Sequence, residues 1–166
     1  MKILFVCLGN VCRSPLAEAI FKHRIEEKNL AERFLVDSCG TSTYEVGNPP
    51  DARTIKNAKK GGIAIQHIAR QLSQRDVEKF DLILAMDQHN LDAIMQLPNM
   101  TLHKGKIKLM REFDPMGLGD VPDPYYGSEK DFQLVFDILD RSIHSLIATI
   151  ISDFQPPKSK IQNLKY

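Results

Sequence analysis

Short apolar runs alternate along this chain with longer segments in which apolar residues recur every three or four positions. The first run, Lys2 to Cys7, is rich in chain-stiffening residues and predicts a buried strand. Gly9-Asn10 interrupts it, and Ser14-Pro15 then opens a predicted helix that extends to about Asn29, with proline in its first turn. Similar short runs predict further strands over residues 34–38, 81–86 and 106–110.

Three further segments have helical signals. Ala52 to Lys60 is predicted to be helical until Gly61-Gly62 ends it, and Asp87 is placed to cap a helix over residues 88–96. The clearest helix lies near the C-terminus, where apolar residues repeat at helical spacing: Phe132, Val135, Phe136, Leu139, Ile143, Leu146, Ile147, Ile150 and Ile151. Strands that alternate with helices predict a doubly wound α/β domain, an open parallel sheet with helices on both faces. In such a sheet, ligands bind at the carboxyl ends of the strands.

The length of 166 residues fits a single domain, and 22 basic against 21 acidic residues leave a net charge of +1. This balance indicates neither a nucleic-acid nor a membrane partner, and no apolar stretch approaches the roughly 20 residues of a membrane span. Three cysteines are too few for a disulfide scaffold, so we expect a reducing, cytoplasmic setting. We expect a monomer with a catalytic domain over residues 1–154 and a mobile tail over residues 155–166.

The segment CLGNVCR, from Cys7 to Arg13, carries the candidate chemistry between the first strand and the first helix. Five residues between a cysteine and an arginine let the backbone curl so that its N–H groups converge on one anion. The helix N-terminus behind adds its dipole to the same anion site, and Gly9 and Asn10 can take positive φ. Arg13 can close the ring with two parallel hydrogen bonds to phosphate oxygens. A thiol in this positive field ionises readily, so Cys7 is the predicted nucleophile.

Removal of phosphate from tyrosine also needs an acid, because the phenolate leaving group, with a pKa of about 10, departs faster when it is protonated. The candidate is Asp123, which precedes Pro124 in a loop from Arg111 to Gly127 that is unusually long for a compact domain. Tyr125 and Tyr126, next to it, can wall a flat aromatic slot. An Asp-Pro pair alone is turn chemistry; together with the cysteine loop it predicts a general acid.

Together, VCLGNVCRSP near the start and DPYYG near the end resemble the low-molecular-weight protein tyrosine phosphatases, over nearly the whole chain to about Phe154. The resemblance implies a four-stranded parallel sheet, no cofactor, and a phosphocysteine intermediate on Cys7. It implies Arg13 as the phosphate clamp and Asp123 as general acid and then base. The implied substrate is a phosphotyrosine-containing protein or a small aryl phosphate, and the implied product is inorganic phosphate.

The resemblance also assigns supporting and substrate-contacting residues. Asn10, Ser14, Ser38, His67 and Asp87 match positions that support the loop from behind, although a helix cap explains Asp87 equally well. The expected contacts to substrate are Leu8, Gly9, Asn10, Val11, Cys12, Ser14, Tyr44, Glu45, Tyr125 and Tyr126. Cys39 stands where many relatives have alanine, and we expect this small, buried side chain to have little effect.

Cys12 lies inside the loop and serves no step of this hydrolysis. A small apolar filler is its simplest role, but a sulfenic acid on Cys7 can be captured by a nearby thiol as a disulfide. We therefore predict reversible oxidation through a Cys7–Cys12 disulfide, as the resemblance also suggests. The five histidines show no metal-ligand spacing with the cysteines, so we predict no metal site.

Two alternative functions compete with the phosphatase interpretation. An arsenate reductase on the same fold uses the same anion loop but passes electrons along further cysteines in the middle of the chain, and no cysteine follows Cys39. A non-catalytic phosphotyrosine-binding module is indicated by loss of the nucleophile or the acid, and both Cys7 and Asp123 are present. The sequence therefore favours a catalyst over both alternatives.

Overall fold

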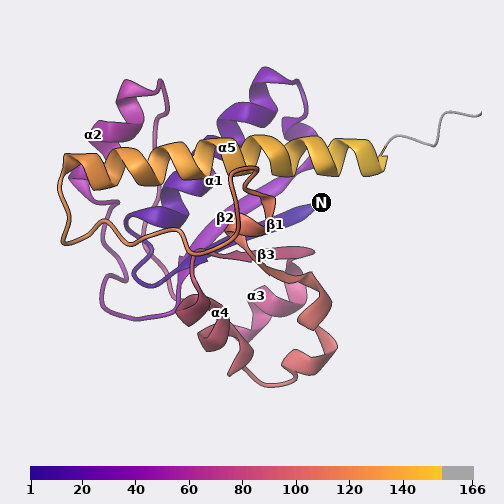
Figure 1. The fold of residues 1–166 in the computed structure, drawn as a ribbon. Helices are drawn as coiled ribbons and strands as arrows, with labels where there is room; N and C mark the ends of the chain where they lie inside the picture. The colour runs from indigo at the N-terminus through magenta and orange to yellow at the C-terminus, as the bar shows by residue number, and fades with distance from the viewer. Residues whose placement is uncertain (155–166) are drawn as a thin grey trace, which may run out of the picture.

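The computed structural model describes residues 1–154 and contains a four-stranded sheet in which neighbouring strands are all parallel (Figure 1). The strands are β1 (Lys2–Cys7), β2 (Leu35–Gly40), β3 (Leu82–Ala85) and β4 (Ile107–Leu109), and their order across the sheet is β2-β1-β3-β4. The predicted fold class is confirmed. The predicted mobile tail, residues 155–166, lies outside the described residues.

Helices cover both faces of this sheet (Figure 1). One face carries α1 (Arg13–Glu27) and α5 (Glu129–Phe154), with α2 (Ala52–Lys60) packed against α5. The other face carries α3 (Gln74–Lys79) and α4 (Gln88–Met95). Short 3₁₀ turns complete the described chain at Ala31–Arg33, Met100–Leu102, Lys104–Lys106 and Met110–Phe113. Only α3 among these α-helices was missed from the sequence.

The inner strand β1 is apolar from Ile3 to Cys7 because both of its faces are covered. Ile3 and Phe5 belong to the larger hydrophobic cluster, which α1 and α5 complete. Leu4 and Val6 point to the opposite face and join the smaller cluster beneath α3 and α4. A strand buried on both faces reads as a continuous apolar run rather than an alternating one, which explains the pattern at the start of the sequence.

The carboxyl end of β1 is the point at which the strand order reverses. From β1 the chain crosses through α1 to β2 on one side, and it later enters the sheet as β3 on the other side of β1. Such a reversal opens a crevice beyond the strand ends, where α/β sheets bind ligands. The loop after β1 packs closely on the end of β2, since a Cβ on Gly40 would lie 2.7 Å from the carbonyl oxygen of Leu8. No helix of residues 1–154 is long and apolar enough to cross a membrane.

Candidate active site

The loop of residues 8–12 curls so that hydrogen-bond donors face the sulfur of Cys7. The backbone N–H of Asn10 donates to Cys7 Sγ at 3.2 Å, and the Ser14 hydroxyl lies 3.0 Å from the same atom. Asn10 takes the positive φ expected of it, 58°, whereas Gly9 does not take one. Space around Gly9 is tight instead, because a Cβ there would lie 3.3 Å from Cγ of Glu45. The positive end of α1, which begins at Arg13, adjoins the loop.

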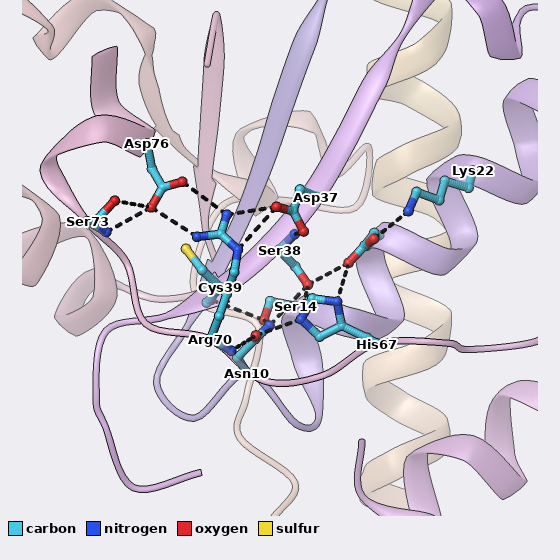
Figure 2. A network of polar contacts seen from close by, with 11 residues as sticks. Asn10, Ser14, Lys22, Asp37, Ser38, Cys39, His67, Arg70, Ser73 and Asp76 are labelled. Atoms are coloured by element: carbon cyan, nitrogen blue, oxygen red, sulfur yellow. Dashed lines mark hydrogen bonds and ion pairs between the residues drawn. The ribbon is translucent and has the colours of Figure 1, made fainter. Parts of the chain in front are cut away.

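The side chain of Asn10 is fully buried behind the loop and makes four hydrogen bonds there (Figure 2). Its Oδ1 accepts from His67 Nε2 at 2.7 Å and from the backbone N–H of Arg70 at 3.0 Å. Its Nδ2 donates to the hydroxyls of Ser14 at 2.8 Å and Ser38 at 3.0 Å. These partners come from α1, β2 and the segment after α2, so three parts of the fold hold the loop in shape.

Glu18, which the sequence reasoning missed, extends this network from α1. Its Oε2 accepts from the Ser38 hydroxyl at 2.7 Å and lies 3.2 Å from His67 Nδ1, while its Oε1 pairs with Lys22. Burial would raise the pKa of Glu18, but the hydrogen bonds from His67, Lys22 and Ser38 hold it below its usual value. Both ring nitrogens of His67 therefore face oxygen acceptors, Glu18 on one side and Asn10 on the other, which fixes the ring.

Arg70 joins the same network to β2 and α3, and it too was missed (Figure 2). Its guanidinium lies 2.8 Å from Asp37 and 3.0 Å from Asp76, and its backbone carbonyl accepts from Gly40 N–H at 2.9 Å. Asp76 also accepts from the N–H and the hydroxyl of Ser73, which caps α3. The main chain of Arg70, which bonds Asn10, is thus anchored through its side chain.

Arg13 is buried and held by three acceptors. Its Nη1 donates to Asp87 at 2.6 Å and to the Val121 carbonyl at 3.0 Å, and its Nη2 donates to Asp123 at 3.2 Å. Burial disfavours the charge, but the opposing charges of Cys7, Asp87 and Asp123 outweigh it and raise the pKa of Arg13 above its usual value. The guanidinium therefore remains a fixed cation at the base of the crevice.

Asp87 contacts both Arg13 and the start of α4. Its Oδ2 accepts from Arg13, and its Oδ1 accepts from the backbone N–H of Asn90 at 2.7 Å, which caps α4. Asp123 is likewise held twice, because its Oδ1 accepts from the backbone N–H of Tyr125 at 3.1 Å. The long loop and the start of α4 thus orient the groups around Arg13.

Cys7, Arg13 and Asp123 line one pocket of about 240 Å³. The other lining residues are Leu8, Gly9, Val11, Cys12, Ser42, Tyr44, Glu45, Tyr125 and Tyr126. The rings of Tyr125 and Tyr126 pack edge to face with their centroids 5.0 Å apart. Tyr44 and Tyr126 are exposed at the mouth, at 84% and 98%. Asn10 and Ser14 do not line this pocket, because their side chains point behind the loop; Ser42, which does line it, was not predicted.

All three cysteines are buried and unpaired. Burial raises the pKa of Cys12 to about 12 and raises that of Cys39 well above its usual value, so both are neutral thiols near pH 7. Cys39 is fully buried, as expected. Cys12 lines the same pocket as Cys7.

Glu18, Asp37 and His67 bring potential metal ligands within 4.8 Å of one another. Each carboxylate is already paired with a cation of the protein, Glu18 with Lys22 and Asp37 with Arg70. A metal ion would have to displace both of these partners. We therefore interpret the cluster as part of the network that supports the loop.

A sequence profile described as "Low molecular weight phosphotyrosine protein phosphatase" matches residues 2–156. The chain belongs to this family. The low molecular weight phosphotyrosine protein phosphatase of Rattus norvegicus is 47% identical over 135 residues, which cover 81% of this chain and 85% of the rat protein. A crystal structure of a protein tyrosine phosphatase from Entamoeba histolytica has 41% identity and a TM-score of 0.88, covering 92% of this chain and 98% of that one. A drosophila arginine phosphatase has 34% identity and a TM-score of 0.84, covering 92% and 99%.

The sequence identified the loop and Asp123, and the structure brings Cys7, Arg13 and Asp123 into one pocket. Glu18 and Arg70 were missed because their partners are remote in sequence. Glu18 did leave a signal: it lies among Leu16, Ala17 and Ile20, on the buried side of α1. A charged residue within an apolar helix stripe requires a buried partner, and that requirement could have directed attention to His67.

Proposed function

We propose that this chain hydrolyses phosphotyrosine in proteins, and small aryl phosphates, through a phosphocysteine intermediate on Cys7. The observation that carries the proposal is the convergence of Cys7, Arg13 and Asp123 on one pocket with tyrosine walls. A nucleophile, an anion clamp and an acid are the three groups that phosphate transfer from a phenol needs.

In the first step the thiolate of Cys7 attacks phosphorus, and the bond between phosphorus and the tyrosine oxygen breaks. The N–H groups of the loop and Arg13 bind the three remaining phosphate oxygens and stabilise the charge of the transition state. Asp123 gives its proton to the departing phenolate. Its place next to Arg13, at 3.2 Å, puts this carboxyl beside the phosphate that the guanidinium would bind.

In the second step the same carboxyl, now ionised, takes a proton from a water molecule that attacks phosphorus. The bond between phosphorus and Cys7 Sγ breaks, inorganic phosphate leaves, and the thiolate is restored. The Ser14 hydroxyl, 3.0 Å from Sγ, is placed to donate to the sulfur as it regains its charge. The residues behind the loop, Asn10, Ser38 and His67, act by keeping the N–H groups aimed at one point.

The walls of the pocket favour an aromatic ester. Tyr44, Tyr125 and Tyr126 line it with aromatic rings, and Leu8 and Val11 add apolar surface. Relatives named as tyrosine phosphatases support this choice, and the similar arginine phosphatase makes phosphoarginine the comparison to test.

An arsenate reductase and a non-catalytic binding module are less favoured. Cys7, Cys12 and Cys39 are the three cysteines of the chain, so a cysteine relay through its middle has no members, and the nucleophile and acid are both in the pocket. Free, buried cysteines suit a reducing compartment, and we place the enzyme in the cytoplasm as a monomer.

The test is phosphate release from a phosphotyrosine peptide, phenyl phosphate and phosphoarginine, with a chelator present, by wild type, Cys7→Ser and Arg13→Ala. We expect wild type to hydrolyse the two aryl esters and to prefer them over phosphoarginine. Cys7→Ser should lose turnover but keep binding of phosphate-like anions, and Arg13→Ala should lose both. Turnover by Cys7→Ser, or a preference for phosphoarginine, would contradict the proposal.

A further inference from the structure

A second, smaller cleft adjoins the pocket and has a different chemical character. It measures about 100 Å³ and lies between α2 and the start of α5, with Phe132 among its lining residues. Arg53 and Lys56 contribute cations, and Glu129 is the carboxylate among the lining residues. The reaction proposed above uses none of these side chains.

Arg53 separates the cleft from the pocket. Its guanidinium carbon lies 4.7 Å from the ring centroid of Phe132, in the cleft, and 5.5 Å from that of Tyr125, in the pocket wall. Phe132 in turn packs with Val11 and Cys12 of the phosphate loop. The two hollows are therefore neighbours, one side chain apart.

The guanidinium of Arg53 is held rigidly with donors to spare. Asp51, at the N-terminus of α2, accepts from its Nε at 3.0 Å and its Nη2 at 2.7 Å. An arginine carries five N–H donors, so three remain for a ligand. A cation that is stacked on two aromatic rings and oriented by a carboxylate loses little freedom when it binds an anion.

Lys56 leaves the cleft with an unbalanced positive charge. Among residues 1–154 it forms no ion pair within 4.0 Å, whereas Glu129 is paired with Lys60. The field of Lys56 nevertheless reaches Glu129, because Lys60 first and Lys56 with it hold the pKa of that carboxyl below its usual value. Within residues 1–154, Arg53 forms an ion pair with Asp51 and Glu129 forms one with Lys60, whereas Lys56 forms none.

We propose that this cleft, formed by Arg53, Lys56 and Phe132, binds the carboxylate side chain of an acidic residue that flanks the phosphotyrosine in the substrate. The inference rests on the proposed phosphatase function and adds to it a preference for acidic sequence context. An acidic side chain would meet the free edge of Arg53 and the ammonium of Lys56 over an aromatic surface. Exposed ion pairs are worth little each, so we expect a preference of about two- to fivefold in kcat/KM, declining with added salt.

The experiment compares phosphotyrosine peptides that carry one glutamate, moved through the positions on either side of the phosphotyrosine, with peptides that carry glutamine there. The kcat/KM ratio of each pair is measured for wild type, Lys56→Glu and Lys59→Glu. Lys59 is exposed on the same helix but does not line the cleft. Lys59→Glu therefore has the same net charge as Lys56→Glu and leaves the cleft unchanged. Phenyl phosphate, which has no flanking residue, normalises the rate of each protein.

We expect the glutamate preference at one or two positions in wild type, its loss or reversal in Lys56→Glu, and its retention in Lys59→Glu. Equal rates for all glutamate and glutamine peptides would overturn the inference and leave the phosphatase function intact. A preference that survives in Lys56→Glu, or disappears equally in Lys59→Glu, would also overturn it. Failure of wild type to release phosphate from phenyl phosphate and every peptide would instead refute the phosphatase function.

Discussion

Asp114 anchors the loop that carries Asp123, and its replacement tests how far this anchor stabilises the fold. Its side chain is wholly buried and lies between two arginines. Arg111 Nε donates to it at 2.8 Å, Arg141 donates through Nε at 2.7 Å and Nη2 at 2.9 Å, and the Met116 N–H donates at 2.9 Å. Arg141 belongs to α5, so this carboxylate fastens the loop to the longest helix.

The size of the effect follows from the pKa of Asp114. Hydrogen bonds from Arg141 first, and then from Met116 and Arg111, outweigh burial and lower this pKa from 3.8 to about 2. Each pKa unit corresponds to about 1.4 kcal/mol, so the ionised form contributes roughly 2 kcal/mol to the free energy of unfolding. Because the folded pKa is depressed, the contribution is complete above about pH 4 and is lost as the pH falls toward about 2.

Asp114→Asn should therefore unfold more easily at pH 7, by roughly 2 kcal/mol, or about 4–8 °C in Tm for a domain of this size. Urea and thermal unfolding of wild type and variant measure this, and the gap should narrow as the pH is lowered from about 4. Asp153→Asn, an exposed aspartate at the end of α5, is the control for the lost charge. Equal stability of Asp114→Asn and wild type at pH 7, or a gap that persists unchanged at about pH 2, would refute the reasoning.

Three further predictions concern the active site. Asp123→Ala should lower the rate on phenyl phosphate by roughly 10²–10⁴, and less for esters of acidic phenols; equal losses would exclude it as the acid. After peroxide and then a thiol reductant, wild type should recover its activity and Cys12→Ser should not; equal recovery, with no Cys7–Cys12 cross-link by mass spectrometry, would leave Cys12 as packing. Arg70→Met should lower kcat more than it raises KM, with partial rescue in Arg70→Lys, because the residue positions Asn10; an unchanged kcat would limit Arg70 to stability.

Much of the fold could be predicted because its signals are local. The run after Lys2 is continuously apolar up to Cys7 because β1 is covered on both faces. The helical periodicity of α5 arises because one side of this helix packs into the larger hydrophobic cluster along its length. The short helix α3 escaped prediction because its six residues contain one buried apolar side chain, Val77. Its start was encoded nonetheless, as a capping box from Ser73 to Asp76.

The chemistry of the pocket was predictable for a similar reason, and its support was not. Cys7 and Arg13 are the two ends of one short loop, so their relative position is encoded by seven consecutive residues. Glu18, Arg70 and Asp114 form pairs whose members are far apart along the chain, and only the packed fold decides which acid meets which base. Sequence patterns identify a charged residue, but its partner depends on tertiary structure.

The residues of the site fall into two groups along the chain, because the chain forms the strand on one side of β1 first and the strand on the other side later. The nucleophile and every side chain that bonds Asn10 come from residues before α3, whereas Asp87, Val121 and Asp123, which hold Arg13, come after it. Arg13 therefore has its two carboxylate partners only in the complete sheet, in which β3 lies beside β1. The clamp and the acid thus depend on residues of the second half of the chain, whereas the side chains that bond Asn10 belong to the first half. A variant that loosens the second half, such as Asp114→Asn, should impair proton donation by Asp123 before it disturbs anion binding by the loop.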